Sequence, residues 1–131
     1  MATITPIVTA APSPGDVRGY TVQWGPMANG DVGVPVTLLS FADRSVQVEG
    51  ILGAGGIAEI QGSNDGVNFR PLHDPLGVLL DFNAASDKIR HIMEITYLLR
   101  PSIVAGDGTT SLTVTIYVAG SVSRLGTGGG E

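Results

Sequence analysis

Hydrophobic and polar residues alternate along short stretches of this chain, and glycine or proline interrupts the alternation. The clearest stretch is 111–120, where Leu112, Val114, Ile116 and Val118 alternate with threonine, tyrosine and alanine. A period of two residues places successive side chains on opposite faces of a β-strand. The pattern predicts about eight short strands, in the segments 17–24, 34–41, 45–52, 56–62, 67–72, 77–82, 96–104 and 111–120.

Strands at this spacing, separated by Gly, Asn and Asp, are typical of an antiparallel sandwich or barrel. A chain of 131 residues is one ordinary domain by length, and it buries roughly two-thirds of the surface of its unfolded form. We therefore predict an all-β fold, an antiparallel β-sandwich of jelly-roll-like form, over residues 17–120. Proline forbids a helix in "AAPSPG", so residues 1–16 are expected to form an extended N-terminal arm and residues 121–131 a Gly-rich tail.

Two local features bear on the order of the strands. The Asp-Gly dipeptide at 107–108 lies between the segments 96–104 and 111–120 and can supply the positive φ of a tight hairpin, so these two strands are expected to pair. Residues 86–95, "SDKIRHIMEI", fit two structures, a helix capped by Ser86 or an alternating strand. The sequence leaves both open.

Charged residues make up only 15% of the chain, against about a quarter in a typical domain. A surface of Gly, Ser, Thr, Asn and apolar side chains is poorly protected against association, which indicates a protein that packs against neighbours. Seven basic and twelve acidic residues give a net charge of −5, and the basic residues are scattered singly. Nucleic-acid binding needs clustered Lys and Arg, so we expect no nucleic-acid partner. No apolar run is long enough to span a membrane.

No motif in the sequence favours catalysis. The segment 53–58, "GAGGIA", matches a dinucleotide-binding fingerprint, but too few residues follow it for the helix on which that motif depends. His73 and His91 have no metal-ligand spacing, and the chain contains no cysteine. Glu49 and Glu59 lie on neighbouring predicted strands, where they form either a facing glycosidase pair or the solvated face of a sheet. We expect no enzyme activity, no cofactor and no metal.

The segment 60–72, "IQGSNDGVNFRPL", raises the question whether its Asn, Asp and Gly residues hold a ligand or turn the chain. A calcium loop needs several carboxylates at fixed spacing, and this cluster has one. Asn, Asp and Gly are also the residues that best tolerate the left-handed conformation of tight turns. We interpret the cluster as a hairpin turn.

The hairpin at 58–69, with "YLLRP" at 97–101 and "DGTTSLTV" at 107–114, resembles segments of small β-sandwich proteins of tailed bacteriophages. The resemblance covers roughly residues 46–120 and rests on structural turns. Proteins of this kind include decoration or cement proteins, which sit on the outside of the capsid and tie shell subunits together. The resemblance implies a non-enzymatic virion protein on the capsid exterior, which binds the major capsid protein and itself, as a homotrimer or homodimer.

A second resemblance is to discoidin-type, galactose-binding-like jelly rolls, which carry a similar "SNDG" hairpin. This chain has Phe69 where those proteins usually have tryptophan, and it lacks the cysteine pair that many of them carry. Sugar binding usually stacks on aromatic faces, and only 5% of this chain is aromatic. A carbohydrate-binding module is therefore the alternative hypothesis, and a tail or fibre-attachment component with the same fold is a third.

Extended termini can cross onto neighbouring subunits and add contact area without enlarging the core, and many equivalent copies then bind with avidity. We therefore expect contacts from the N-terminal arm. Trp24 fits two roles, an interface anchor or a core residue that closes one end of the sandwich. The candidate interface residues are Ile4, Pro6, Ile7, Val8, Pro12, Pro14 and Trp24.

Overall fold

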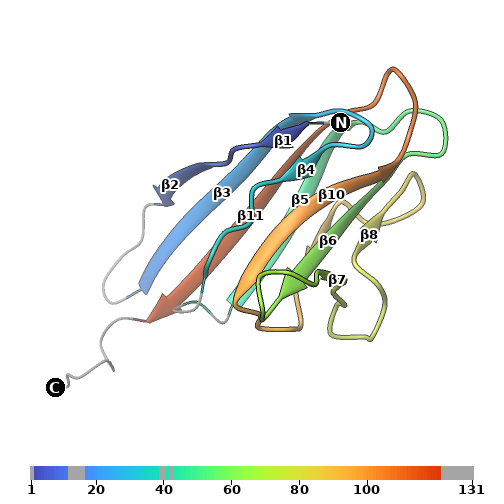
Figure 1. Cartoon of the computed structure of the whole chain (residues 1–131). Coiled ribbons are helices and arrows are strands. Elements are labelled where there is room, and N and C mark those ends of the chain that lie inside the picture. The colour runs from blue at the N-terminus through green and yellow to red at the C-terminus, as the bar shows by residue number, and fades with distance from the viewer. Residues whose placement is uncertain (1, 12–16, 39–40, 42, 122–131) are drawn as a thin grey trace, which may run out of the picture.

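The computed structural model of the chain describes residues 2–11, 17–38, 41 and 43–121. These residues form a sandwich of two β-sheets and contain no helix (Figure 1). The strands are β1 (Thr3–Ile4), β2 (Ile7–Ala11), β3 (Val17–Met27), β4 (Val32–Gly33), β5 (Asp43–Ile51), β6 (Ile57–Ser63), β7 (Arg70–Pro71), β8 (Asp81–Phe82), β9 (Ile89–His91), β10 (Leu98–Ala105) and β11 (Ser111–Ser121).

Sheet A has the strand order β1-β4-β10-β6-β7, with β8 also paired to β6, and sheet B has the order β2-β3-β11-β5-β9. All of these pairs are antiparallel except that of β1 with β4. The chain changes sheet at each step from β3 to β6 and again from β8 to β11. This alternation is the strand order of a jelly roll, and it confirms the predicted antiparallel β-sandwich.

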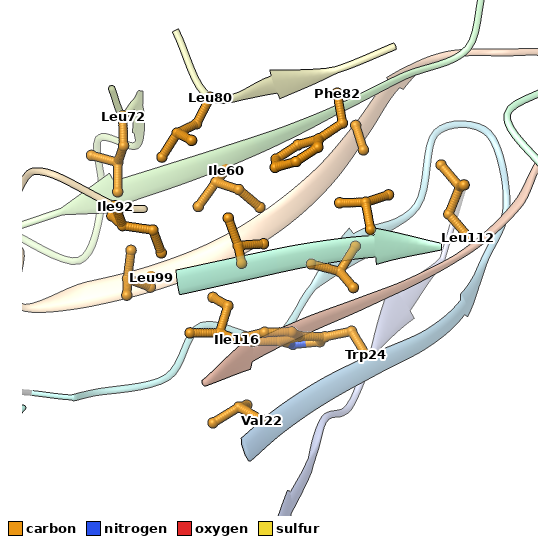
Figure 2. Close-up of a cluster of buried hydrophobic side chains, with 14 of the residues drawn as sticks. Val22, Trp24, Ile60, Leu72, Leu80, Phe82, Ile92, Leu99, Leu112 and Ile116 are labelled. Carbon is orange, nitrogen blue, oxygen red and sulfur yellow. The ribbon is translucent and has the colours of Figure 1, made fainter. Parts of the chain in front are cut away.

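The core lies between the two sheets and takes one face of each (Figure 2). Sheet B contributes alternate residues of β3, β5 and β11, and sheet A contributes alternate residues of β6 and β10. Leu72, Leu80 and Ile92, from segments that flank β7, β8 and β9, complete the core at one side (Figure 2). Because a shift of one residue would turn every apolar side chain of a strand to solvent, this burial fixes the register of the long strands.

The segment before β3, where no strand was predicted, contains two strands, and they join different sheets. β1 pairs in parallel with β4, and β2 pairs with β3. Pro6 lies between them, where the chain passes from sheet A to sheet B. The buried carboxylate of Asp31 accepts hydrogen bonds from the backbone N–H groups of Ala2 (2.9 Å) and Ala28 (2.8 Å), which fastens the start of the segment.

The Asn-Asp-Gly cluster turns the chain between β6 and β7, as predicted, with Gln61 opposite Pro71. Asp65 accepts hydrogen bonds from the backbone N–H groups of Val67 and Asn68, each at 2.8 Å. The backbone and side-chain donors of Asn68 contribute most to lowering the pKa of the Asp65 carboxyl well below its usual range. The carboxylate is therefore occupied by the turn itself.

The predicted hairpin between 96–104 and 111–120 is wrong. β10 pairs with β4 and β6 in sheet A, whereas β11 pairs with β3 and β5 in sheet B. The loop between them crosses from one sheet to the other, and Gly108 does not have a positive φ. Asp107 fixes this crossing, because its carboxylate accepts hydrogen bonds from the backbone N–H groups of Thr109 (2.8 Å) and of the distant Ala54 (2.9 Å).

Residues 86–95 form no helix. Ile89–His91 is strand β9 at the edge of sheet B, and the backbone N–H of Ile92 donates to the carbonyl of Arg44 on β5 (3.0 Å). Ile92 is 1% exposed, so the extended conformation is the one that brings this side chain into the core. Tertiary burial therefore decides between the two structures that the sequence leaves open.

The segment 34–41 is also less regular than predicted. Only Val36 makes a β-bridge there among the described residues, to Leu99. Pro35 has no N–H to donate to a ladder, which limits pairing to an isolated contact.

Candidate functional site

The centre of the outer side of sheet B carries no charged residue, although the exposed Glu49 on β5 lies just beyond it and accepts a hydrogen bond from the side chain of Gln47 at 2.9 Å. Two neighbouring rows of side chains cross all five strands, and the register of the strand pairs fixes their members. The first row consists of Thr9, Thr21, Tyr117, Ser45 and His91. The second row, next to the first, consists of Ile7, Gln23, Thr115, Gln47 and Ile89. We call these two rows the outer face. None of its members is Asp, Glu, Lys or Arg, although the chain has seven basic and twelve acidic residues.

Hydrogen bonds and stiff side chains hold the outer face in place. The side-chain amide of Gln23 donates to the hydroxyl of Thr115 at 3.0 Å, and the hydroxyl of Thr21 donates to the carbonyl of Thr9 at 3.5 Å. Threonine is β-branched and restricted at χ1. A surface whose side chains are already held loses little conformational entropy when a partner covers it.

Tyr117 lies across the neighbouring strand β3. A Cβ added to Gly19 would stand 2.7 Å from the Tyr117 hydroxyl oxygen and 3.0 Å from its Cε1, so the ring rests directly on the backbone of Gly19. Gly19 is buried beneath it, and Tyr117 is 39% exposed. Glycine at this position therefore lets the largest side chain of the outer face lie along the sheet.

The outer side of sheet A differs in its charge. Glu59 is opposite Asp81 in the register, and Glu59 accepts a hydrogen bond from the side chain of Gln61 at 2.8 Å. Arg100 donates to Gln61 at 2.9 Å, and its guanidinium lies 3.9 Å from the centre of the Phe69 ring. The cores of protein interfaces are depleted in Asp and Glu, so the outer face of sheet B is the better docking surface of the two.

Four of the predicted contact residues are described in the N-terminal segment. Ile7 and Val8 on β2 are 67% and 60% exposed, and Ile7 belongs to the outer face. Ile4 on β1 packs against the core instead, and Pro6 is half-buried. The structure therefore places the exposed apolar surface of this segment on β2.

The other predicted contact residues are Trp24, Pro12 and Pro14, and the two prolines lie outside the described residues. Trp24 is 0% exposed, and its indole N–H donates to the carbonyl of Val34 at 3.0 Å. Its ring fills the space beside Gly33, since a Cβ added there would lie 2.7 Å from Trp24 Cδ1. Trp24 takes the core role, and it presents no surface to a partner.

An open hollow of about 420 Å³ lies beside β8 and β9 and is lined in part by Asp74, Asp81, Asp87 and Arg90. Arg90 donates to the Asp74 carboxylate at 3.0 Å and to the carbonyls of Leu79 (2.8 Å) and Asp81 (3.0 Å). The hydrogen bond from Arg90 holds the pKa of Asp74 below its usual value. Arg90 is thus engaged by the chain itself rather than directed at a ligand.

His73 and Glu94 form a second polar pair. His73 Nδ1 lies 2.6 Å from one Glu94 oxygen, and the backbone N–H of His73 donates to the other at 2.7 Å. Burial raises the pKa of Glu94, but the hydrogen bonds from His73 outweigh it and the net pKa is lowered. Glu49 and Glu59 lie on different sheets and do not form a facing pair.

The described residues offer neither a cluster of metal ligands nor a membrane-spanning helix. No group of three or more His, Asp or Glu side chains in residues 2–11, 17–38, 41 and 43–121 is arranged to hold a metal ion. The same residues include no helix with the length and hydropathy to cross a membrane.

The described aromatic residues do not form a platform for a sugar. Trp24 is buried, and Tyr20 packs inward against Phe41 with ring centres 5.3 Å apart. Tyr97 and Tyr117 are 47% and 39% exposed, but Tyr97 precedes β10 of sheet A and Tyr117 belongs to sheet B. This arrangement weakens the carbohydrate-binding alternative.

Among the members of the outer face only Ile7 was a predicted contact residue, although part of the signal of this surface is visible in the sequence. The alternation in 111–120 already sets Thr115 and Tyr117 on the side opposite the apolar residues. The sequence alone does not show that these two residues belong to an uncharged surface, because the register of the strands places uncharged residues of the other four strands beside them.

Comparison with known proteins identifies the fold. No protein-family model matches the chain, and no curated protein matches it. The crystal structure of the SPBc2 prophage-derived protein YomS is similar, with a TM-score of 0.57 over 78% of this chain and 95% of that chain, at 11% sequence identity. At this identity the similarity shows a shared fold.

Proposed function

We propose that this chain is a non-enzymatic structural protein of a tailed-phage virion. In this proposal it attaches to the outside of the capsid, binds the major capsid protein, and ties neighbouring shell subunits together as a decoration protein. The uncharged outer face of sheet B is the observation that carries the proposal. The similarity of the fold to a prophage-derived protein supports a phage origin.

The outer side of sheet B has the size and chemistry of a protein-binding surface. Five strands about 4.8 Å apart give a width of about 24 Å. The three central strands have nine to eleven residues and extend about 30 Å or more, whereas β2 and β9 at the edges have five and three residues. The outer side of sheet B therefore covers on the order of 600 Å², which is most of the roughly 800 Å² that each partner contributes to an interface of standard size.

Binding through this surface has a low desolvation cost. Threonine, serine and glutamine carry neutral hydrogen-bonding groups, and such groups cost far less to remove from water than an unpaired charge does. The exposed Ile7 and Ile89 at opposite edges of the face, 67% and 59% exposed, add apolar area. Many equivalent copies on a lattice then give firm attachment from modest individual contacts.

The proposal is tested first by counting copies of this protein in purified particles from its source, by quantitative mass spectrometry. A lattice-wide decoration protein is expected at a simple fraction of the copy number of the major shell protein. A few copies per particle would assign the chain to the tail or a vertex instead. Absence from the particles would overturn the virion role.

A second test asks whether the outer face makes the contact. Thr115 lies on the central strand β11, so Thr115→Lys and Thr115→Glu each place a charge in the middle of the face. Both are expected to weaken attachment to particles that lack the native protein by at least about tenfold, because burial of an unpaired charge is costly whatever its sign.

The matched controls are Val104→Lys and Val104→Glu, because Val104 is 49% exposed on β10 of the other sheet. These variants are expected to attach like the native protein. If both Thr115 variants attach normally while keeping a native melting transition, the outer face is not the capsid contact.

A further inference from the structure

The edges of the two sheets differ in length. Sheet A ends in β1 on one side and in β7 and β8 on the other, and each of these strands has two residues. Sheet B ends in β9, with three residues, and in β2, with five. Very short edge strands are one means by which proteins avoid edge-to-edge pairing. Among the described strands, β2 alone offers a long edge, and it lies at the outer limit of sheet B (Figure 1).

β2 also lacks the other usual protections of an edge. Charged side chains, especially lysine, and proline within the strand normally block pairing with another chain. The sequence from Ala2 to Ala11 has no Asp, Glu, Lys or Arg, and its proline precedes the strand. Ile7, Val8, Thr9 and Ala10 are all exposed, and β2 pairs with β3 alone among the described strands.

We infer that a second copy of this chain pairs with the free edge of β2, in antiparallel orientation across a twofold axis. The two five-stranded sheets then form one continuous sheet through the dimer. Backbone N–H and C=O groups that face the free edge of β2 gain partners in the other copy, as in β-strand addition.

A second copy suits this edge because the segment is complementary to itself. An interface related by a twofold axis brings the same patch of both chains together, and the absence of charge on β2 means that no like charges meet. Val8 and Ala10 share one side of the strand, with Val22 and Tyr20 as their register partners. A twofold axis at Thr9 sets Val8 of one copy opposite Ala10 of the other, so a larger side chain meets a smaller one.

Burial supplies the driving force. Val8 pairs with Val22, whose side chain is 0% exposed, yet Val8 itself is 60% exposed because it stands at the end of the row. The second copy would cover part of this surface and part of Ile7, which is 67% exposed. This inference shares with the proposed function only the expectation of self-association, and its tests use the isolated protein without capsids.

The first test is sedimentation of the full chain over a range of concentrations, with the variant Val8→Lys. The native chain is expected to show a monomer–dimer equilibrium, and a lysine at the edge is expected to raise the dimer dissociation constant by at least about tenfold. Val104→Lys is the control, since it adds the same charge to an exposed position of sheet A, and its dimer should match the native one.

Circular dichroism and the melting transition establish that each variant is folded. A native chain that stays monomeric at all concentrations would overturn the inference. A trimer, or a dimer that Val8→Lys leaves intact, would overturn it as well.

The second test uses the absence of cysteine from the chain. A single Thr9→Cys substitution is expected to form an intermolecular disulfide under mild oxidation, because residues opposite one another in an antiparallel pair have Cα atoms about 4.5–5.5 Å apart, within the range that a disulfide spans. Val104→Cys is the control for random collision. Cross-linking of Thr9→Cys no faster than that of Val104→Cys would contradict the pairing of β2 with its copy.

Discussion

Replacing Trp24 with phenylalanine separates a core role from a contact role for the one tryptophan of the chain. The side chain is 0% exposed, and its N–H donates to the carbonyl of Val34 at 3.0 Å. Phenylalanine keeps an aromatic ring at this position but has no donor and fewer ring atoms. The substitution therefore removes a hydrogen bond and some core packing while it leaves the surface unchanged.

The expected loss follows from these two changes. Leaving the carbonyl of Val34 without its partner costs about 1 kcal/mol. The smaller ring removes about three CH₂-sized groups from the core, at about 0.8 kcal/mol each. We expect the free energy of unfolding to fall by about 3 kcal/mol, which for a chain of 131 residues lowers Tm by about 10 °C.

Urea denaturation followed by far-ultraviolet circular dichroism is the appropriate assay, because the variant has no tryptophan fluorescence. The midpoint should fall at an unchanged m value, since the same surface is exposed on unfolding. Tyr117→Phe is the matched control, because it removes a hydroxyl from an aromatic side chain on the exposed side of the same sheet. It should change the free energy of unfolding by less than about 0.5 kcal/mol.

The opposite pattern would refute this reasoning. If Trp24→Phe unfolds like the native chain but loses dimerisation or capsid attachment, Trp24 is a contact residue and the core account is wrong. A less stable variant with native binding is the expected outcome.

Two further substitutions test the packing and the loop that crosses between the sheets. Gly33→Ala places a Cβ 2.7 Å from Trp24 Cδ1, so urea denaturation should show that the free energy of unfolding falls by about 1–3 kcal/mol. Gly108→Ala is the control, because its Cβ meets no atom within 4 Å, and it should lower the free energy of unfolding by less. Hydrogen bonds from the side chain of Thr109 and from backbone donors lower the pKa of Asp107 from 3.8 to about 2. The ionised Asp107 therefore stabilises the fold above about pH 4, and this contribution to the free energy of unfolding is lost as the pH falls toward 2. Asp107→Asn should flatten that acid dependence in a denaturation series; equal acid dependence in Asp107→Asn and the native chain would contradict the assignment.

The long strands β3, β5, β6, β10 and β11 and the turn at 63–66 were predictable because their causes are local. The alternation along 111–120 reflects the burial of one side of a strand, and the apolar residues that meet this need are only two positions apart in the sequence. The turn depends on Ser63, Asp65 and Gly66, whose hydrogen bonds span no more than a few residues.

The partners of the strands were not predictable in the same way. The short loop between β10 and β11 suits a hairpin within one sheet or a crossing between two sheets, and nearby residues do not distinguish them. The contact that fixes the crossing joins Asp107 to Ala54, which is far away in the sequence. The outer face was missed for the same reason, because it is assembled from the register of five strands.

The two proposed contacts share Ile7 and Thr9 on β2, but the positions chosen to test them are separate, which makes their effects separable. Thr115 is on the central strand and points outward, whereas Val8 is on the edge strand and shares the side of the buried Val22, with β3 between the two strands. Changes at sites that share no partners act independently, so Thr115→Lys should stay dimeric in solution. Val8→Lys should keep the outer face intact but lose the avidity that two linked copies provide. Reduced attachment by both variants, with loss of the dimer in only one of them, is the pattern that requires two distinct surfaces.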